Sequence, residues 1–91
     1  MDFEWDHNKN RLNIEKHGID FEDARRIFEG LFWEIPSHQG WHDEDRVLAI
    51  GILDGREIVV VYTWRERNRR IISARRARRY ERKTYWKAIK G

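Results

Sequence analysis

The C-terminal third of the chain concentrates side chains that can bind phosphate. Nine arginines occur there: Arg65, Arg67, Arg69, Arg70, Arg75, Arg76, Arg78, Arg79 and Arg82. A guanidinium group is a planar fork of donors that matches phosphate oxygens and also stacks on bases. The interleaved aromatics are Tyr62, Trp64, Tyr80, Tyr85 and Trp86. Because aromatic faces stack with unpaired bases, the cluster predicts a polyanionic or acidic partner. A solvated helix face with aromatic residues in the core is the structural alternative.

Candidates for proton transfer are fewer. The histidines, which titrate nearest neutral pH, are His7, His17, His38 and His42. His17 ends a predicted helix, where it is either catalytic or a cap that favours the helix dipole. Glu81 stands almost alone among arginines and is either a general base or a salt-bridge partner of Arg78, Arg82 or a sheet arginine. Those neighbours favour its ionised form.

The absence of known motifs argues against hydrolase triads, nucleotide kinases and dinucleotide-binding enzymes. No GxSxG, P-loop, GxGxxG or HExxH pattern occurs. His38 and His42 are four residues apart, but Pro36 and Gly40 disfavour a helix there, so no metal site and no cofactor are predicted. Ribonucleolysis stays open, because the RNA 2′-hydroxyl supplies the nucleophile. A protein then only orients that group, moves a proton and stabilises charge.

Length and composition indicate the kind of protein that carries these residues. A length of 91 residues predicts a single domain covering 1–91. The chain has no cysteine, which excludes disulfides and thiolate chemistry. The acidic start lacks an apolar signal region, and no run approaches the roughly 20 apolar residues of a membrane span. We therefore expect a cytoplasmic protein with no membrane partner.

The net charge of +3 conceals a separation along the chain. Residues 1–63 hold 7 Lys and Arg against 14 Asp and Glu, a net charge of −7. Residues 64–91 hold 12 against 2, a net charge of +10. This asymmetry suggests a polyanionic partner. We expect the arginines to form one basic face beside the tyrosines.

The elements that position these residues follow from periodicity. A short strand at 3–5 precedes a helix capped by Asp6 and stopped at Gly18, and a second helix capped by Asp20 covers 20–31. Strands are predicted at 31–35, 47–53, 58–64 and 70–74, with a polar loop at 36–45 and a hairpin turn at Asp54-Gly55. A basic helix covers about 75–90, with an expected stripe of Ala77, Tyr80, Thr84 and Ala88. The pattern is α+β: a small antiparallel sheet, two N-terminal helices and one C-terminal helix.

Two stretches carry a family likeness. The first is Phe3 to Asp6 with Lys16-His17-Gly18 and Phe21 to Ala24. The second is Val61 to Thr63 with Arg70 to Ala77, then Glu81-Arg82 and Tyr85. Together they resemble the BrnT family of bacterial toxins over nearly the whole chain. Trp64 to Arg67, which follows Tyr62-Thr63, departs from the family pattern.

The resemblance implies a type II toxin–antitoxin module. Its toxin would be a ribonuclease with a RelE-like fold that inhibits translation by cleaving RNA. The implied partner is a BrnA-like antitoxin with a ribbon-helix-helix domain, in a complex of two toxins and two antitoxins. That complex would bind operator DNA through the antitoxin.

The resemblance also points to individual residues: Lys16, His17, Tyr62, Arg65, Ser73, Arg75, Glu81, Arg82 and Tyr85. In the resulting hypothesis, Arg65, Arg75 and Arg82 bind phosphate and stabilise the transition state. His17 or Glu81 accepts the proton, and Tyr62 or Tyr85 orients or stacks the substrate. Further RNA contacts are expected from Lys16, Arg67, Arg70, Arg76, Arg79 and Tyr85. The alternatives are a non-catalytic module that binds nucleic acid or antitoxin, and a regulatory subunit whose basic helix receives a partner.

Overall fold

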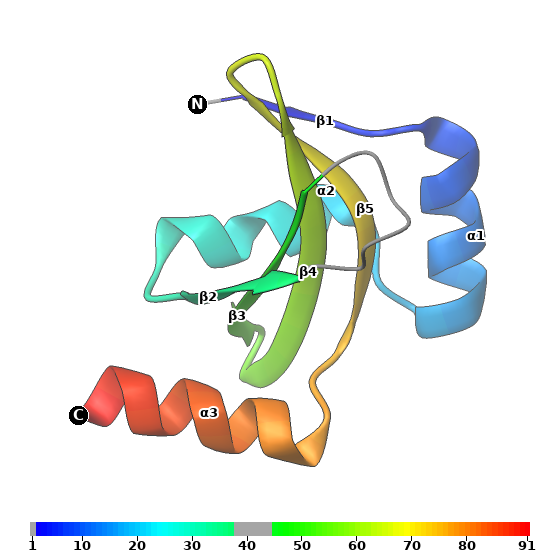
Figure 1. The fold of residues 1–91 in the computed structure, drawn as a ribbon. Coiled ribbons are helices and arrows are strands. Elements are labelled where there is room, and N and C mark those ends of the chain that lie inside the picture. Colours follow the sequence, from blue (N-terminus) through cyan, green and yellow to red (C-terminus); the bar gives the residue numbers. More distant parts are fainter. Residues whose placement is uncertain (1, 38–44) are drawn as a thin grey trace.

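A five-stranded sheet with helices on both faces forms the molecule (Figure 1). A computed structural model describes residues 2–37 and 45–91. Along the chain the elements are β1 (Phe3–Glu4), α1 (His7–His17), α2 (Phe21–Ala24), the 3₁₀ helix η1 (Arg25–Glu29), β2 (Trp33–Ser37), β3 (Arg46–Leu53), β4 (Arg56–Arg65), β5 (Asn68–Arg76) and α3 (Arg79–Lys90). This confirms the predicted α+β architecture.

The strand order is β1-β5-β4-β3-β2. The last four strands form the expected antiparallel meander, whereas β1 pairs with β5 in parallel, so the sheet is mixed. Edge strand β2 continues through Pro36, where the sequence predicted it to stop. An edge strand tolerates proline because one side of the strand needs no ladder hydrogen bonds. Most of the predicted 36–45 loop lies outside the described residues.

Helix and turn signals operate as predicted. The Asp6 carboxylate accepts from the N–H groups of Asn8 and Lys9, and the Asp20 carboxylate accepts from Glu22 N–H. Gly18 ends α1 at a φ of 71°. Asp54 and Gly55 both have positive φ, as a type I′ hairpin turn requires. The second helix is shorter than expected, because after Ala24 the chain tightens into η1.

The two faces of the sheet carry separate cores, because neighbouring side chains of a strand point in opposite directions. On the first, called the α2 face, Phe21 and Ile27 pack on a cluster that includes Ile58 and Tyr62. On the second, called the α3 face, Tyr85 packs on a cluster that includes Ile50 and Val59. No described helix is long and apolar enough to cross a membrane.

Two close contacts fix the helices of the α2 face. The Asn13 amide donates to the carbonyls of Ile19 and Ala74 at 2.9 Å each and accepts from Ala74 N–H at 3.1 Å. It therefore anchors α1 to β5. A Cβ added to Gly51 would lie 2.7 Å from the Ile27 Cβ, so only glycine lets η1 approach β3 this closely.

Candidate active site

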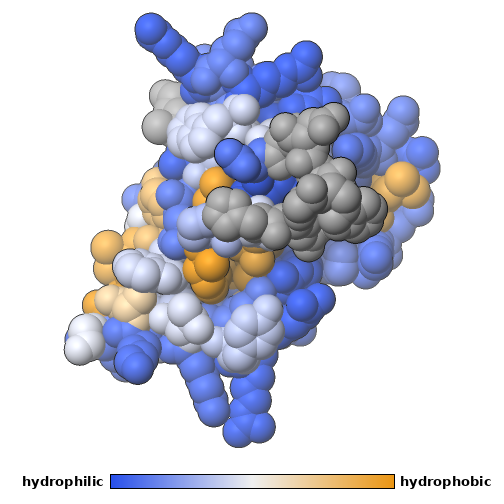
Figure 2. All heavy atoms as spheres, viewed as in Figure 1, coloured by the Kyte–Doolittle hydropathy of each residue, from blue (hydrophilic) through white to orange (hydrophobic). Residues whose placement is uncertain are grey.

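A hollow of about 390 Å³ opens on the α3 face where α3 begins. Its lining comes from all four strands of the meander and from the start of α3: Ser37, Arg46, Leu48, Val61, Ile72, Ser73, Arg75, Arg78 and Tyr80. We call it the α3-face hollow. Apolar side chains form part of the lining, and three guanidinium groups supply positive charge. In Figure 2 apolar residues gather around β2 in the middle of the view, and hydrophilic residues cover the top and bottom.

A β-bulge aims Arg75 into this hollow. Tyr62 pairs with Ile71 and Val61 pairs with Ser73, so Ile72 is an extra residue in β5. Before the bulge Arg69 and Ile71 face the α2 side, and after it Ala74 does. Without the extra residue Arg75 would share the face of Ile71. The bulge therefore reverses the direction of Arg75, and bulges are common beside active sites for this reason.

Glu81 holds Arg75 in a fixed position. The Arg75 Nη1 and Nη2 atoms donate to the two Glu81 carboxylate oxygens at 2.8 and 2.9 Å, and Arg78 N–H donates to Oε1 at 2.7 Å. Glu81 is 1% exposed, and the Arg75 side chain is 18% exposed. Nη1 also donates to Arg76 O, so within the described residues the Nε hydrogen and one Nη2 hydrogen of Arg75 are left for a ligand.

Electrostatics keep this pair charged. Burial alone would raise the pKa of Glu81, but the hydrogen bonds from Arg75 and Arg78 N–H outweigh it and lower the pKa below its ordinary value of 4.5. The hydrogen bonds to Glu81 and the charge of that carboxylate raise the pKa of Arg75. Glu81 is thus the salt-bridge partner of a sheet arginine, the contact that the sequence offered as one alternative. Its oxygens are occupied, so its geometry suits positioning of Arg75.

Tyr80 and Arg78 stand at the rim of the hollow. Tyr80 is 60% exposed, although it shares the expected stripe with Ala77, which is buried. The buried residues of α3 are instead Glu81 and Tyr85. The pairing of Glu81 with Arg75 fixes the rotation of the helix and turns Tyr80 outward.

Two of the predicted catalytic residues, Tyr62 and Arg65, do not line the α3-face hollow. The Tyr62 ring is buried on the α2 face, and its hydroxyl donates to the Glu34 carboxylate. Burial and then Glu34 raise the pKa of Tyr62, so the hydroxyl keeps its proton. Arg65 is the last residue of β4, next to the β4–β5 turn, and its guanidinium is 3.7 Å from the Glu4 carboxylate.

Five other predicted residues also lie outside the lining of the α3-face hollow. Arg70 pairs with Glu4 at 2.7 Å, and Arg67 is exposed in the neighbouring turn. Arg82 donates to the Ala77 carbonyl at 3.0 Å, and Arg79 is exposed at the first turn of α3. The Tyr85 ring is buried and its hydroxyl donates to the Leu31 carbonyl at 3.0 Å.

His17 and Arg76 lie together, but not in the α3-face hollow. They line a second hollow on the α2 face, and Lys16 is exposed beside it in the last turn of α1. Burial, followed by the charges of Lys16 and Arg75, lowers the pKa of His17. The expected single basic face is therefore wrong: the arginines divide between the two faces, the β4–β5 turn and α3.

Sequence reasoning missed three contributors to the α3-face hollow. Arg78 and Tyr80 belong to the basic cluster but were not predicted as site residues. Arg46 directly follows a run of acidic residues, so it was not counted with the basic cluster. Ser73 was named through the family pattern alone. Strand register could have found Arg46, since the Val47–Tyr62 pair brings the start of β3 beside the end of β4. His38 and His42 lie outside the described residues, and no three potential metal ligands cluster among residues 2–37 and 45–91.

Comparisons with known proteins identify the family. The profile described as "Ribonuclease toxin, BrnT, of type II toxin-antitoxin system" matches residues 5–81. The crystal structure of the Brucella abortus ribonuclease toxin BrnT is similar at 29% identity and a TM-score of 0.67, covering 87% of this chain and 99% of that one. No curated protein sequence matches. With most of its length matched and the fold shared, the chain belongs to the BrnT ribonuclease toxin family of type II toxin–antitoxin systems.

Proposed function

We propose that this toxin cleaves RNA in the α3-face hollow without a metal ion. The observation that carries the proposal is Arg75, which the bulge of β5 turns into the hollow and which Glu81 holds from behind. An arginine fixed before the substrate arrives loses little entropy on binding phosphate. The family supports RNA as the substrate.

The chemistry follows from the residues that line the hollow. The 2′-oxygen of one nucleotide attacks the adjacent phosphorus, the bond from phosphorus to the 5′-oxygen breaks, and the 5′-oxygen gains a proton. Arg46, Arg75 and Arg78 stabilise the negative charge of the phosphorane. We assign protonation of the leaving oxygen to the Tyr80 hydroxyl, and the 2′-proton passes to solvent.

The described lining of the hollow includes neither a histidine nor an unpaired carboxylate. Catalysis therefore depends mainly on orientation of the 2′-hydroxyl and on charge stabilisation. We assign Glu81 to positioning rather than to proton transfer, because its hydrogen bonds within the described residues hold Arg75 and the start of α3. Arg65, Arg82, Tyr62 and Tyr85 contribute to folding or to peripheral charge in this scheme.

We infer the cellular role of the protein from its family. RNA cleavage inhibits translation, and a ribbon-helix-helix antitoxin of the BrnA type neutralises the toxin in a complex of two copies of each. The net charge of +10 on residues 64–91 supports an antitoxin segment that is acidic where it contacts the toxin. Operator DNA is then bound through the antitoxin.

The test combines chemistry and growth. Purified protein is incubated with RNA in excess EDTA, and fragments ending in a 2′,3′-cyclic phosphate are expected. Expression in bacteria is expected to arrest growth, with relief by the product of the neighbouring gene. Salt-dependent RNA binding without fragments would instead favour a non-catalytic module.

A further inference from the structure

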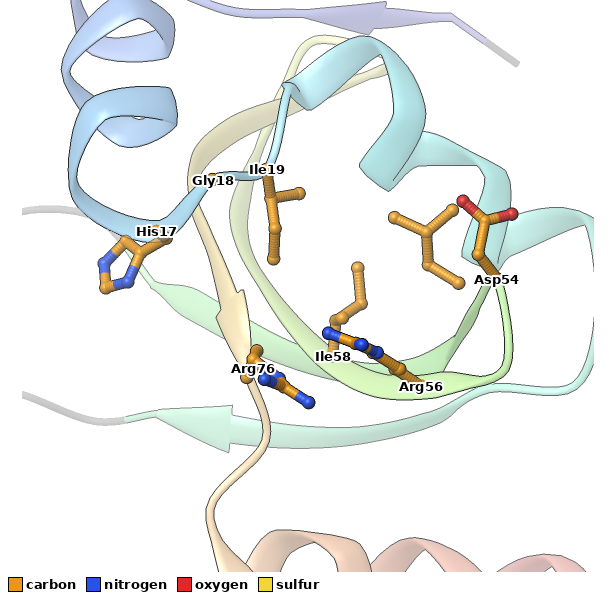
Figure 3. Close-up of a pocket in the computed structure, with 8 residues that line it drawn as sticks. His17, Gly18, Ile19, Asp54, Arg56, Ile58 and Arg76 are labelled. Carbon is orange, nitrogen blue, oxygen red and sulfur yellow. The ribbon is translucent and has the colours of Figure 1, made fainter.

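The second hollow lies on the α2 face, between the α1–α2 connection and the β3–β4 turn. It measures about 390 Å³ and is lined by His17, Gly18, Ile19, Leu53, Asp54, Arg56, Ile58 and Arg76. In Figure 3 the Arg56 and Arg76 side chains reach over it from different strands, with Ile19 and Ile58 between them and the helices. We call it the α2-face hollow. It combines an apolar floor with a cationic rim.

The charge of this rim is unbalanced. Its only acid among the lining residues is Asp54, whose carboxylate is already 3.2 Å from Arg26. Within the described part of the chain, no hydrogen bond or ion pair joins the guanidinium of Arg56 or Arg76 to a carboxylate. Asp54 is the one acid in the lining, and Arg76 also acts electrostatically on Glu57, but neither carboxylate bonds to Arg56 or Arg76. The two guanidinium groups on one rim therefore favour an anionic ligand.

The apolar floor indicates which class of anion would fit the α2-face hollow. Ile19 and Leu53 are half-buried and offer an apolar surface that inorganic phosphate would leave uncovered, whereas a nucleobase would cover it. Ile58 is buried and adds little to that surface. A lone carboxylate side chain of an acidic peptide is also too small to cover that floor. A nucleotide, with its phosphate on the two arginines and its base against Ile19 and Leu53, satisfies both parts of the lining.

The position of the hollow connects it to the proposed cleavage site. Arg75 and Arg76 are consecutive in β5 and face opposite sides of the sheet, so the two hollows flank the same strand end. We propose that the α2-face hollow is a second RNA site, which binds one nucleotide of the substrate outside the cleaved bond. Arg56 and Arg76 hold its phosphate, and His17 lies at the same rim. This inference rests on the proposed function, because it takes RNA as the substrate.

The experiment measures binding rather than cleavage. A 2′-O-methyl RNA octamer, which cannot be cleaved, is titrated against the wild type, the double variant Arg56→Gln with Arg76→Gln, and a control double variant. The control is Arg11→Gln with Arg25→Gln, which removes the same charge from exposed arginines on the helices. Circular dichroism melting checks that all three proteins are folded.

We expect the Arg56/Arg76 variant to lose about tenfold in affinity. Its plot of log affinity against log salt should be shallower by about 0.7, the value for one phosphate contact on a single strand. The control should change neither quantity by as much. RNA binding should also shift the His17 imidazole resonances of the wild type.

Three results would overturn the inference. The first is equal loss in both double variants, which would show a general charge effect. The second is inorganic phosphate binding at His17 with octamer affinity unchanged, which would show a site for free anions. The third is unchanged RNA affinity with lost antitoxin binding, which would make the hollow a protein contact. Failure of the wild type to cleave RNA would instead contradict the proposed function, and the binding result would still decide this site.

Discussion

Arg75 and Arg76 are neighbours in β5, yet their surroundings differ in almost every respect. Arg75 is 18% exposed and bonded to both oxygens of a buried carboxylate, whereas Arg76 is exposed and has no carboxylate bonded to it among the described residues. The first is held rigid before any ligand arrives, and the second is free to adapt. The difference shows that the function of an arginine depends on which face it occupies and what lies behind it, and less on its place in a basic run.

The largest expected effect comes from removing the support of Arg75. Glu81→Gln would leave the half-buried Arg75 guanidinium without its counter-charge, so we expect the free energy of unfolding to fall by about 3 kcal/mol and RNA cleavage to fall with it. Urea denaturation measures the first quantity. Glu15→Gln, which breaks only an exposed helix pair with Arg11, is the control and should cost less than about 0.5 kcal/mol. Equal costs would remove the distinction between the two arginines.

The same pair should give a pH dependence in acid. The folded-state pKa of Glu81 lies below its ordinary value of 4.5, so its stabilisation is fully present above pH 4.5. It is lost as the pH falls through the folded-state pKa. The stability curves of the wild type and Glu81→Gln should therefore converge as the solution is acidified below pH 4.5. Parallel curves throughout this range would show that folding does not lower the pKa of Glu81.

The tyrosines of the two faces allow a second test. Tyr80→Phe removes the hydroxyl at the α3-face hollow, and we expect cleavage to slow by about 100-fold with stability unchanged. Tyr62→Phe removes the bond to Glu34 on the α2 face, and it should cost about 1 kcal/mol of stability while cleavage continues. Rates from single-turnover cleavage and midpoints from urea denaturation separate the two outcomes. A reversed pattern would move the active site to the α2 face.

The smallest effect is expected at the β4–β5 turn. Arg65 is an exposed side chain 3.7 Å from Glu4, and Glu4 keeps its closer partner Arg70 when Arg65 is changed. Arg65→Gln should therefore alter stability by less than about 0.5 kcal/mol. Differential scanning calorimetry would detect a larger change, which would indicate a structural role that the contacts do not explain.

Local signals made much of the fold predictable. Asp6, Gly18 and Asp20 act at single helix ends, and Asp54-Gly55 acts within one turn, so the sequence alone determines their effects. Asn13 could not be predicted in the same way. Its partner Ala74 is 61 residues away, and a polar residue in a helix does not reveal which strand it will contact.

The candidate site was less predictable because it depends on one residue of register. The extra residue Ile72 decides that Arg75 faces α3, and periodicity does not reveal a bulge where two isoleucines, Ile71 and Ile72, are adjacent. The rotation of α3 then follows from Arg75, which draws Glu81 inward and leaves Tyr80 outside. Glu81 was singled out from its arginine neighbours and Arg75 from the basic cluster and the family pattern, but the choice of Arg75 as the partner of Glu81 and the contribution of Arg46 required the fold.

The most direct test compares Arg75 with Arg65 while charge is kept constant. Cleavage of a defined RNA in EDTA is measured for the wild type, Arg75→Lys and Arg65→Lys, each with its melting temperature. Lysine keeps the charge but loses the planar fork, so Arg75→Lys should lower the rate by roughly 100-fold, while Arg65→Lys should match the wild type. Wild-type rates from a folded Arg75→Lys protein, or a loss confined to Arg65→Lys, would contradict cleavage in the α3-face hollow.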